Sequence, residues 1–325
     1  MSASLTLSRL VSILRPTLRG RVSFSSPAAV LARFPKPMKR SRSNRIAFQG
    51  EPGANSHLAA RDAYPRMEAL ACPTFEDAIA AVKTGGAKFA MIPIENSVAG
   101  RVADIHHLLP HSGLHIVAEH FEGVRHQLLT LPGVKLSELK TVHSHIMALG
   151  QCRNAIRTLK LRPVVEADTA GAARHLRETG DRSAGVIASK LAADIYGLKV
   201  AKADIEDAEH NTTRFVVLSA KPEKVRAGDG LVITSFVSRV RNVPAALYKA
   251  LGGFATNGVN MTKLESYQLE GSFNATMFYA DIEGHPDERP VKLAMEELHF
   301  FSSEVTVLGT YPASPFRAEL KAQHG

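Results

Sequence analysis

The order of helix and strand patterns changes once along this chain, on either side of a charged, glycine-containing segment at 221–230. Before it, apolar stretches typical of buried strands alternate with amphipathic helical patterns, which predicts an α/β domain over 44–220. After it, the order is strand, helix, strand, strand, helix, strand over 231–312, which is typical of a ferredoxin-like α+β fold. We therefore expect two domains joined by a linker, followed by a tail at 313–325.

Local signals place the individual elements. Ser144 is the predicted N-cap of a helix at 144–159, and Asn242 is the predicted N-cap of a helix at 243–256. The other main helices are expected at 55–64, 169–178 and 289–301. The predicted strands are 45–48, 89–94, 163–165, 185–188, 199–203, 214–219, 231–238, 259–268, 272–282 and 304–311.

The charge distribution argues against nucleic acid as a partner. The 325 residues carry a net charge of +9, but nine of the 40 Lys and Arg residues lie in 1–43, which contains no acidic residue. The rest of the chain therefore has 31 basic and 31 acidic residues, and no net charge to attract a phosphate backbone. No apolar run is long enough for a membrane-spanning helix, so we expect no membrane partner either.

The N-terminal segment 1–43 bears on localisation alone. It is rich in Arg and Ser, as transit peptides are, and lacks the apolar core of a secretory signal. A disordered tail, or translated sequence upstream of a true start at Met38, explains it as well. Cys72 and Cys152 give no disulfide framework and suit a reducing compartment. We expect a cytoplasmic protein, with import into an organelle as the alternative.

Two polar clusters are candidates for binding a ligand. Glu95, Asn96 and Ser97 follow a predicted buried strand, at the edge where α/β sheets bind ligands. A polar loop with a helix cap explains the same residues. Ser144 and Gln151 share one face of a predicted helix whose N-terminus favours an anion. An ordinary N-cap and a surface Gln are the alternative.

A third cluster, at 211–215, leads directly into an apolar strand. The Thr213 hydroxyl can donate a proton to a leaving oxygen, and Arg214 can hold a carboxylate through two hydrogen bonds. Two β-favouring threonines and a salt-bridged arginine are the alternative. A glycine-rich turn at 49–56 is a weaker candidate for binding an anion. The 14 histidines lack metal-binding spacing, and we predict no metal site.

Taken together, these residues resemble the prephenate dehydratase family. The resemblance runs from Asn44 to Tyr311 and rests on six ordered motifs, which are AFQGEPGANSHLAA, MIPIENSVAGRV, VHSHIMALGQC, EADTAGAAR, YGLKV and NTTRFVVLS. It implies a two-lobed catalytic domain like a periplasmic binding protein, with prephenate in the cleft. It also implies that the second domain is an ACT domain, a regulatory ferredoxin-like fold that binds phenylalanine in this family.

The resemblance further implies a reaction and roles for individual residues. Prephenate loses CO₂ and hydroxide and becomes phenylpyruvate, and aromatisation drives the reaction, so no metal or organic cofactor is needed. Thr213 is the candidate donor of a proton to the departing hydroxyl. The residues expected to position the substrate are Asn96, Ser144 and Gln151, and those expected to bind it or orient their neighbours are Glu95, Ser97, Asp168, Thr169, Arg214 and Phe215.

The regulatory motifs differ from those of the family. The first usually has Gly before Ala-Leu, where this chain has Ala245, and the second, Glu-Ser-Arg-Pro, has Tyr267 and Gln268 in its last two places. Phenylalanine inhibition is still expected. So is a homodimer or homotetramer, since such domains usually pair across a two-fold axis. The residues expected at the phenylalanine site are Asn242, Val243, Pro244, Ala245, Ala246, Leu247, Glu265 and Ser266.

Two other functions stay open from the sequence. Arogenate, which has an amino group in place of the keto group of prephenate, is the alternative substrate. A non-catalytic protein that binds an amino acid is the alternative of another class, although such a protein has no evident need for a proton donor at Thr213.

Overall fold

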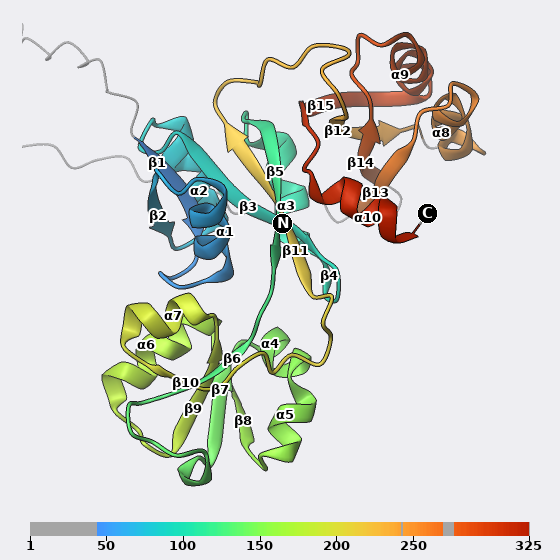
Figure 1. The fold of residues 1–325 in the computed structure, drawn as a ribbon. Coiled ribbons are helices and arrows are strands. Elements are labelled where there is room, and N and C mark those ends of the chain that lie inside the picture. Colours follow the sequence, from blue (N-terminus) through green and yellow to red (C-terminus); the bar gives the residue numbers. More distant parts are fainter. Residues whose placement is uncertain (1–43, 242, 269–275, 325) are drawn as a thin grey trace, which may run out of the picture. The chain divides into compact units, whose positions relative to one another are not determined.

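The computed structural model describes residues 44–241, 243–268 and 276–324. Three sheets form its framework (Figure 1). Their strand orders are β2-β1-β3-β11-β5, β10-β6-β9-β7-β8 and β13-β14-β12-β15, with β4 added beside β3. None of the helices in the described part of the chain is long and apolar enough to cross a membrane.

The first sheet belongs to the first lobe and has helices on both faces. The helix α1 (Asn55–Ala63) packs on one face, and α2 (Phe75–Lys83) and α3 (Ala103–Leu108) pack on the other. Both faces are buried because β1, β3 and β11 carry nearly continuous apolar residues. The strands are β1 (Arg45–Gln49), β2 (Glu68–Cys72), β3 (Phe89–Asn96), β4 (Gly100–Arg101), β5 (His115–Gly123) and β11 (Thr212–Ser219).

The second sheet forms a second lobe, inserted between β5 and β11. Leu128 and Leu129 point to opposite faces and join two different apolar cores. One core contains α6 (Thr169–Thr179) and α7 (Lys190–Tyr196), and the other contains α4 (Ile146–Gln151) and α5 (Arg153–Thr158) (Figure 1). The strands are β6 (Gln127–Thr130), β7 (Thr141–Ser144), β8 (Arg162–Val165), β9 (Ala184–Ala188) and β10 (Lys199–Lys202).

Two crossover segments connect these lobes and hydrogen-bond to each other. Val124, after β5, donates its backbone N–H to the carbonyl of Asn211, and Ile205, after β10, donates to the carbonyl of His126. The two-lobed arrangement confirms the expected periplasmic-binding-protein-like architecture. Short 3₁₀ turns lie at Leu109–His111 and Leu136–Glu138.

The third sheet confirms the predicted ferredoxin-like order. Its strands β12 (Val232–Val240), β13 (Met261–Gln268), β14 (Thr276–Glu283) and β15 (Ser302–Pro312) alternate with α8 (Ala246–Thr256) and α9 (Arg289–Phe301). The two helices pack on one face. The other face shares an apolar core with the first lobe, in which Val237 and Tyr279 pack in one cluster with Ile94 and Val216.

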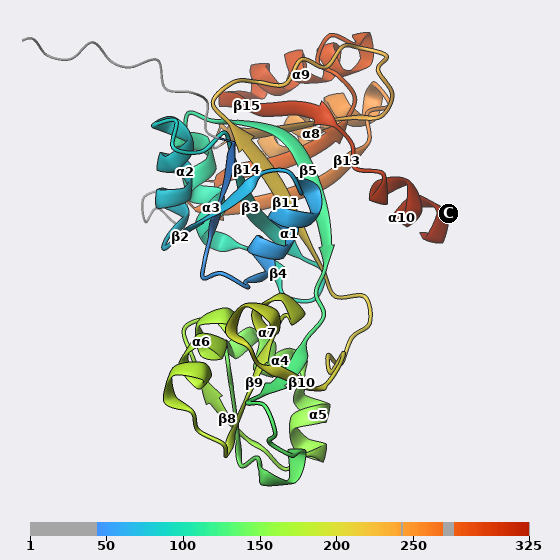
Figure 2. The ribbon, with the colours of Figure 1, turned by 60° about the vertical axis from the view of Figure 1, so that its left-hand side comes forward.

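Three predictions about local structure were wrong. Ser144 ends β7 instead of capping a helix, and the helix expected at 144–159 is divided into α4 and α5. The division has a physical cause, since the Asp207 carboxylate accepts from the backbone N–H groups of Arg153 and Asn154 and caps α5 separately. The expected tail contains a helix, α10 (Phe316–His324), which Figure 2 shows after β15.

The predicted helix at 243–256 begins later than expected. Ala245 is its N-cap, with a left-handed φ of 61°, and no side chain caps the helix. Asn242 and the first part of the strand predicted at 272–282 lie outside the described residues.

Candidate active site

The ends of β3 and β11 bring two pairs of predicted residues side by side. In the antiparallel register, Thr213 lies opposite Asn96, and Arg214 lies opposite Glu95. Because successive side chains of a strand point to opposite faces, the two pairs face opposite sides of the sheet. They therefore belong to two separate polar clusters.

The first cluster is a chain of amide hydrogen bonds. Asn96 donates through Nδ2 to Thr213 Oγ1 at 2.9 Å and to Asn211 Oδ1 at 2.7 Å. Asn211 donates through Nδ2 to Gln151 Oε1 at 2.9 Å. Gln151 ends α4 in the second lobe, whereas Asn96 and Thr213 belong to the first. The structure thus connects Thr213, Asn96 and Gln151 across the two lobes.

Two cavities of about 610 Å³ border this chain. Gln151 lines one of them, together with Val98 of the first lobe, two arginines of α5 and apolar residues of α4, α5 and β8. Asn96 lines the other, together with Phe121 of β5 and Phe316 of α10. Small molecules therefore have room beside Gln151 and beside Asn96.

Ser144, Ser97 and Phe215 lie differently from what was expected. The Ser144 side chain is fully buried and donates to the carbonyl of Ile187 at 2.6 Å, so its proton is used within the second lobe. The Ser97 hydroxyl donates to the carbonyl of His210 at 2.7 Å and holds a loop. Phe215 is 1% exposed and packs in the core beneath α1, away from any polar cluster.

Asp168 and Thr169 lie at the start of α6, and no hydrogen bond among the described residues links them to the amide chain. The Asp168 carboxylate accepts from the backbone N–H of Gly171 at 2.6 Å and caps the helix. Asp168 also lines a cavity of about 370 Å³ with Gln49 and Cys72 of the first lobe.

The glycine-rich turn is not an open anion cradle, because it packs against α7. The carbonyl of Gly53 accepts from Ser189 Oγ at 2.6 Å, and that of Pro52 accepts from the Tyr196 hydroxyl at 2.8 Å. Gly53 has a φ of +96°, and a Cβ at this position would lie 2.8 Å from Ala192 Cα. Only glycine permits this approach, which holds the two lobes together.

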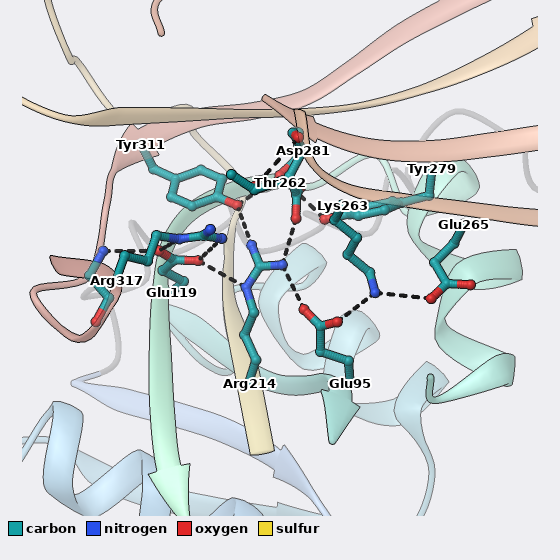
Figure 3. A network of polar contacts seen from close by, with 12 residues as sticks. Glu95, Glu119, Arg214, Thr262, Lys263, Glu265, Tyr279, Asp281, Tyr311 and Arg317 are labelled. Atoms are coloured by element: carbon teal, nitrogen blue, oxygen red, sulfur yellow. Dashed lines mark hydrogen bonds and ion pairs between the residues drawn. The ribbon is translucent and has the colours of Figure 1, made fainter. Parts of the chain in front are cut away.

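The second cluster surrounds Arg214, which sequence reasoning assigned to a substrate carboxylate (Figure 3). Its guanidinium donates to Glu119 at 2.9 Å, to Glu95 at 2.9 Å and to Asp281 at 2.5 Å. It also donates to the Tyr311 hydroxyl at 3.1 Å. The side chain is 3% exposed and these partners occupy its guanidinium, while Arg214 also borders the cavity that Asn96 lines, so its expected contact with a substrate carboxylate stays a prediction.

Charge and burial oppose each other in this cluster. Burial alone would lower the pKa of Arg214, but the neighbouring Asp281 and the other acidic groups outweigh burial and raise it. Burial alone would raise the pKa of Asp281, but the Arg214 charge and the Ser235 hydrogen bond lower it. The ion pair therefore stays charged, and it joins β11 to the third sheet.

The cluster continues from Glu95 to the predicted phenylalanine site. Lys263 donates to Glu95 at 2.6 Å and to Glu265 at 3.2 Å (Figure 3). Burial would raise the pKa of Glu95, but Arg214 and Lys263 lower it. Glu95 is therefore a link between the first and third sheets, and because it also borders the cavity that Asn96 lines, its expected contact with substrate stays a prediction.

Comparison with known proteins decides the family. The model of the prephenate dehydratase family matches residues 46–223. The chain belongs to this family. A bifunctional N-acyl-homoserine lactone acylase/prephenate dehydratase from Komagataeibacter europaeus is 53% identical over 84% of this chain and 97% of the relative.

Two further relatives support the assignment. The chloroplastic arogenate dehydratase/prephenate dehydratase 1 of Arabidopsis thaliana is 38% identical over 82% of this chain and 72% of its own length. The solved structure of a prephenate dehydratase from Arthrobacter aurescens, in complex with L-Phe, is 28% identical with a TM-score of 0.75. It covers 86% of this chain and 97% of the solved one.

Sequence reasoning placed Asn211 in the cluster at 211–215 without a role, and it missed His126 and Asp281. Asn211 is 3% exposed and joins Asn96 to Gln151. His126, 4% exposed, lies 2.8 Å from Gln151 Oε1 through Nε2. Asp281 offered a signal, since a carboxylate enclosed in the apolar run MFYADI needs a buried partner. His126 offered none, because a histidine before an apolar strand is unremarkable.

Proposed function

We propose that this member of the prephenate dehydratase family converts prephenate to phenylpyruvate, with loss of CO₂ and hydroxide. The observation that carries the proposal is the hydrogen bond from Asn96 to Thr213. Thr213 Oγ1 accepts in this bond, so the hydroxyl proton of Thr213 is left to donate to another group. A fixed proton donor at the junction of two lobes is what an elimination of hydroxide requires.

The chemistry balances without any further reactant. The bond between the ring and its carboxylate breaks, and its electron pair enters the ring as CO₂ departs. The C4–O bond breaks at the other side of the ring, and the oxygen leaves as water after it takes the proton of Thr213. Thr213 then recovers a proton from solvent. The aromatic ring formed supplies the driving force, so a weak acid is sufficient.

A matched pair of variants of the full-length protein tests this role. Thr213→Val should lower the kcat for phenylpyruvate formation by roughly a hundredfold or more, as removal of a general acid does. Thr212→Val makes the same change one residue earlier, on the opposite face of β11, and should leave kcat within about twofold. Phenylpyruvate is followed by its absorbance in alkali. Equal activity of Thr213→Val and wild type would remove the mechanism.

Arogenate is the second candidate substrate, because relatives that are 38% identical are named as arogenate dehydratases. The two substrates differ only in an amino or a keto group on the side chain. Comparison of kcat/KM on both, with phenylalanine and phenylpyruvate quantified separately, decides between them. We expect the ratio to favour prephenate. A higher value on arogenate would reassign the substrate while leaving the role of Thr213 in place.

We also propose that the ferredoxin-like domain is an ACT domain that binds phenylalanine and inhibits the enzyme. The solved relative in complex with L-Phe supports this proposal. So does the contact of Glu265 with Lys263, which continues to Glu95 beside the amide chain. Inhibition of the wild-type protein by phenylalanine, relieved in Glu265→Gln, is the expected result. Inhibition that is equal in both would remove Glu265 from the site.

The proposal extends to a cytoplasmic homodimer or homotetramer. Sedimentation equilibrium of the full-length protein should give a mass two or four times 35.1 kDa. A monomer would contradict this part.

Hydrolysis of N-acyl-homoserine lactones is a second candidate activity. The 53%-identical relative is named for it, and the cavity beside Gln151 is lined by unusually exposed apolar side chains. Val98 is 43% exposed, Ile146 54% and Val165 59%, which gives an acyl chain an apolar surface to pack against. Release of homoserine lactone from a decanoyl substrate, abolished by Ile146→Glu, would support it. No release would exclude it.

A further inference from the structure

In the amide chain of the candidate active site each side chain donates to the next, from Asn96 through Asn211 to Gln151, and this order gives the chain a direction. His126 contacts the Gln151 end. An amide group can rotate by 180° and exchange its donor for its acceptor, so its direction depends on partners that can only donate or only accept. The described residues contain such partners for the first amide, Asn96, and the orientation of each later amide follows from the one before it. The direction can therefore be followed from one lobe to the other.

Two backbone N–H groups fix the first amide. Val98 and Ala99 donate to Asn96 Oδ1 at 3.0 and 2.8 Å, and a backbone N–H can only donate. Asn96 Nδ2 must then point to Asn211 Oδ1, and Asn211 Nδ2 must point to Gln151 Oε1. Each amide in the chain is thus oriented by the one before it.

The same reasoning fixes the proton on His126. Gln151 Oε1 can only accept, and it lies 2.8 Å from His126 Nε2, so Nε2 carries the ring proton. Burial lowers the pKa of His126, so the ring is neutral at pH 7 and has one N–H to give. Glu206 is the charged group that faces it, and its carboxylate accepts from the backbone N–H of His126 at 2.9 Å.

We propose that His126 is a positioning residue that holds the Gln151 amide in the direction set by the chain, so that Thr213 at one end and Gln151 at the other each keep a donor for an anionic substrate. At one end the Thr213 proton stays free, since Thr213 Oγ1 accepts from Asn96. At the other end Gln151 turns its oxygen to His126 and Asn211, which leaves its Nε2 group for the cavity that Gln151 lines. The inference rests on the proposed function, because a dianion is what two donors would bind.

Three variants of the full-length protein test the proposal by kinetics. His126→Leu removes the donor and should lower kcat/KM for prephenate by about ten- to a hundredfold, the cost of one buried hydrogen bond left unmade. His126→Gln places an N–H near the same point and should recover most of the loss. His106→Leu, a change at another buried histidine whose ring nitrogens have no partner in the described residues, should leave kcat/KM within about twofold.

A double-mutant cycle with Gln151→Leu adds a second kinetic criterion. If His126 acts through Gln151, the losses in kcat/KM of the two single variants will not add in the double variant. His126→Leu will then lower kcat/KM only slightly in the Gln151→Leu protein. Failure of His126→Gln to recover activity, or fully additive losses, would overturn the proposal.

A spectroscopic measurement tests the chain without reference to turnover. The ¹⁵N spectrum of the wild-type ring, assigned by its loss in His126→Gln, should show a neutral imidazole protonated at Nε2, with slow exchange of that proton. A ring protonated at Nδ1, or at both nitrogens at pH 7, would overturn the proposal. If the wild-type protein turned over neither prephenate nor arogenate, the proposed function would fail, while this spectrum would still decide the direction of the chain.

Discussion

His106 should make the stability of this protein depend on pH in a way that one substitution removes. It lies in α3 with 1% exposure, and neither ring nitrogen has a hydrogen-bond partner in the described residues. Its ring packs edge-on against Tyr279, with 5.2 Å between the ring centroids. A protonated imidazole in this place would be a buried charge with no hydrogen bond, which is costly.

The size of the effect follows from the pKa. Burial lowers the pKa of His106 from its ordinary 6.5 to about 4. The Lys263 charge also lowers it and the Glu265 charge raises it, each by less than burial does. Below pH 6.5 His106 therefore binds a proton in the unfolded chain but not in the folded one, and stability is lost as the pH falls towards 4. The full loss is about 3 kcal/mol, and about 2 kcal/mol of it falls between pH 7 and pH 5.

Urea unfolding of the wild-type protein and His106→Leu at both pH values measures this contribution. Every other titrating group is common to the two proteins, so the difference between their pH dependences isolates His106. We expect His106→Leu to lose about 2 kcal/mol less than wild type between pH 7 and pH 5. It should be at least as stable as wild type at pH 7, since an apolar side chain replaces an unpartnered ring. Parallel losses in the two proteins would refute the reasoning.

Three further predictions concern stability. Arg214→Met leaves buried carboxylates without their cation and should lower the free energy of unfolding by about 3 to 5 kcal/mol in urea titrations; a loss under about 1 kcal/mol would contradict the ion-pair account. Gly309→Ala places a Cβ against the carbonyl oxygen of Ile116 in β5 and should lower the free energy of unfolding by at least about 2 kcal/mol. Gly252→Ala, in α8 with open space around it, is the control and should be neutral or stabilising in the same thermal melts. Ala245→Gly removes a side chain from a left-handed residue and should raise the free energy of unfolding by up to about 1 kcal/mol; a loss of that size would show that Ala245 is unstrained.

Local patterns predicted the α/β class of the first domain and the ferredoxin-like order of the second, whereas the two-lobed arrangement was implied by the family resemblance. The apolar run that ends at Ile94 and the strand after Asn211 each carry their signal within a few residues. The family motifs then identified Asn96, Gln151 and Thr213, which the structure connects.

The long-range partners could not be predicted in the same way. Arg214 has the same sequence neighbours whether it binds a substrate or an ion-pair partner, and the difference lies in Glu119 and Asp281, 95 and 67 positions away. The helix expected at 144–159 failed for a similar reason. Asp207, more than 50 positions away, caps its second half separately.

The ion pair between Arg214 and Asp281 has a consequence for any attempt to obtain the catalytic part alone. The segment 221–230 looks like a natural place to shorten the chain, but a protein ended there would lack Asp281 and Tyr311. It would also expose the apolar face of the first lobe that the third sheet covers. Such a fragment would keep Glu119 and Glu95 beside Arg214, but Arg214, next to Thr213, would lose its contacts with Asp281 and Tyr311. Any change in its turnover would then reflect a damaged strand as much as a lost regulator, so point substitutions in the intact chain are the sounder route to separate regulation from catalysis.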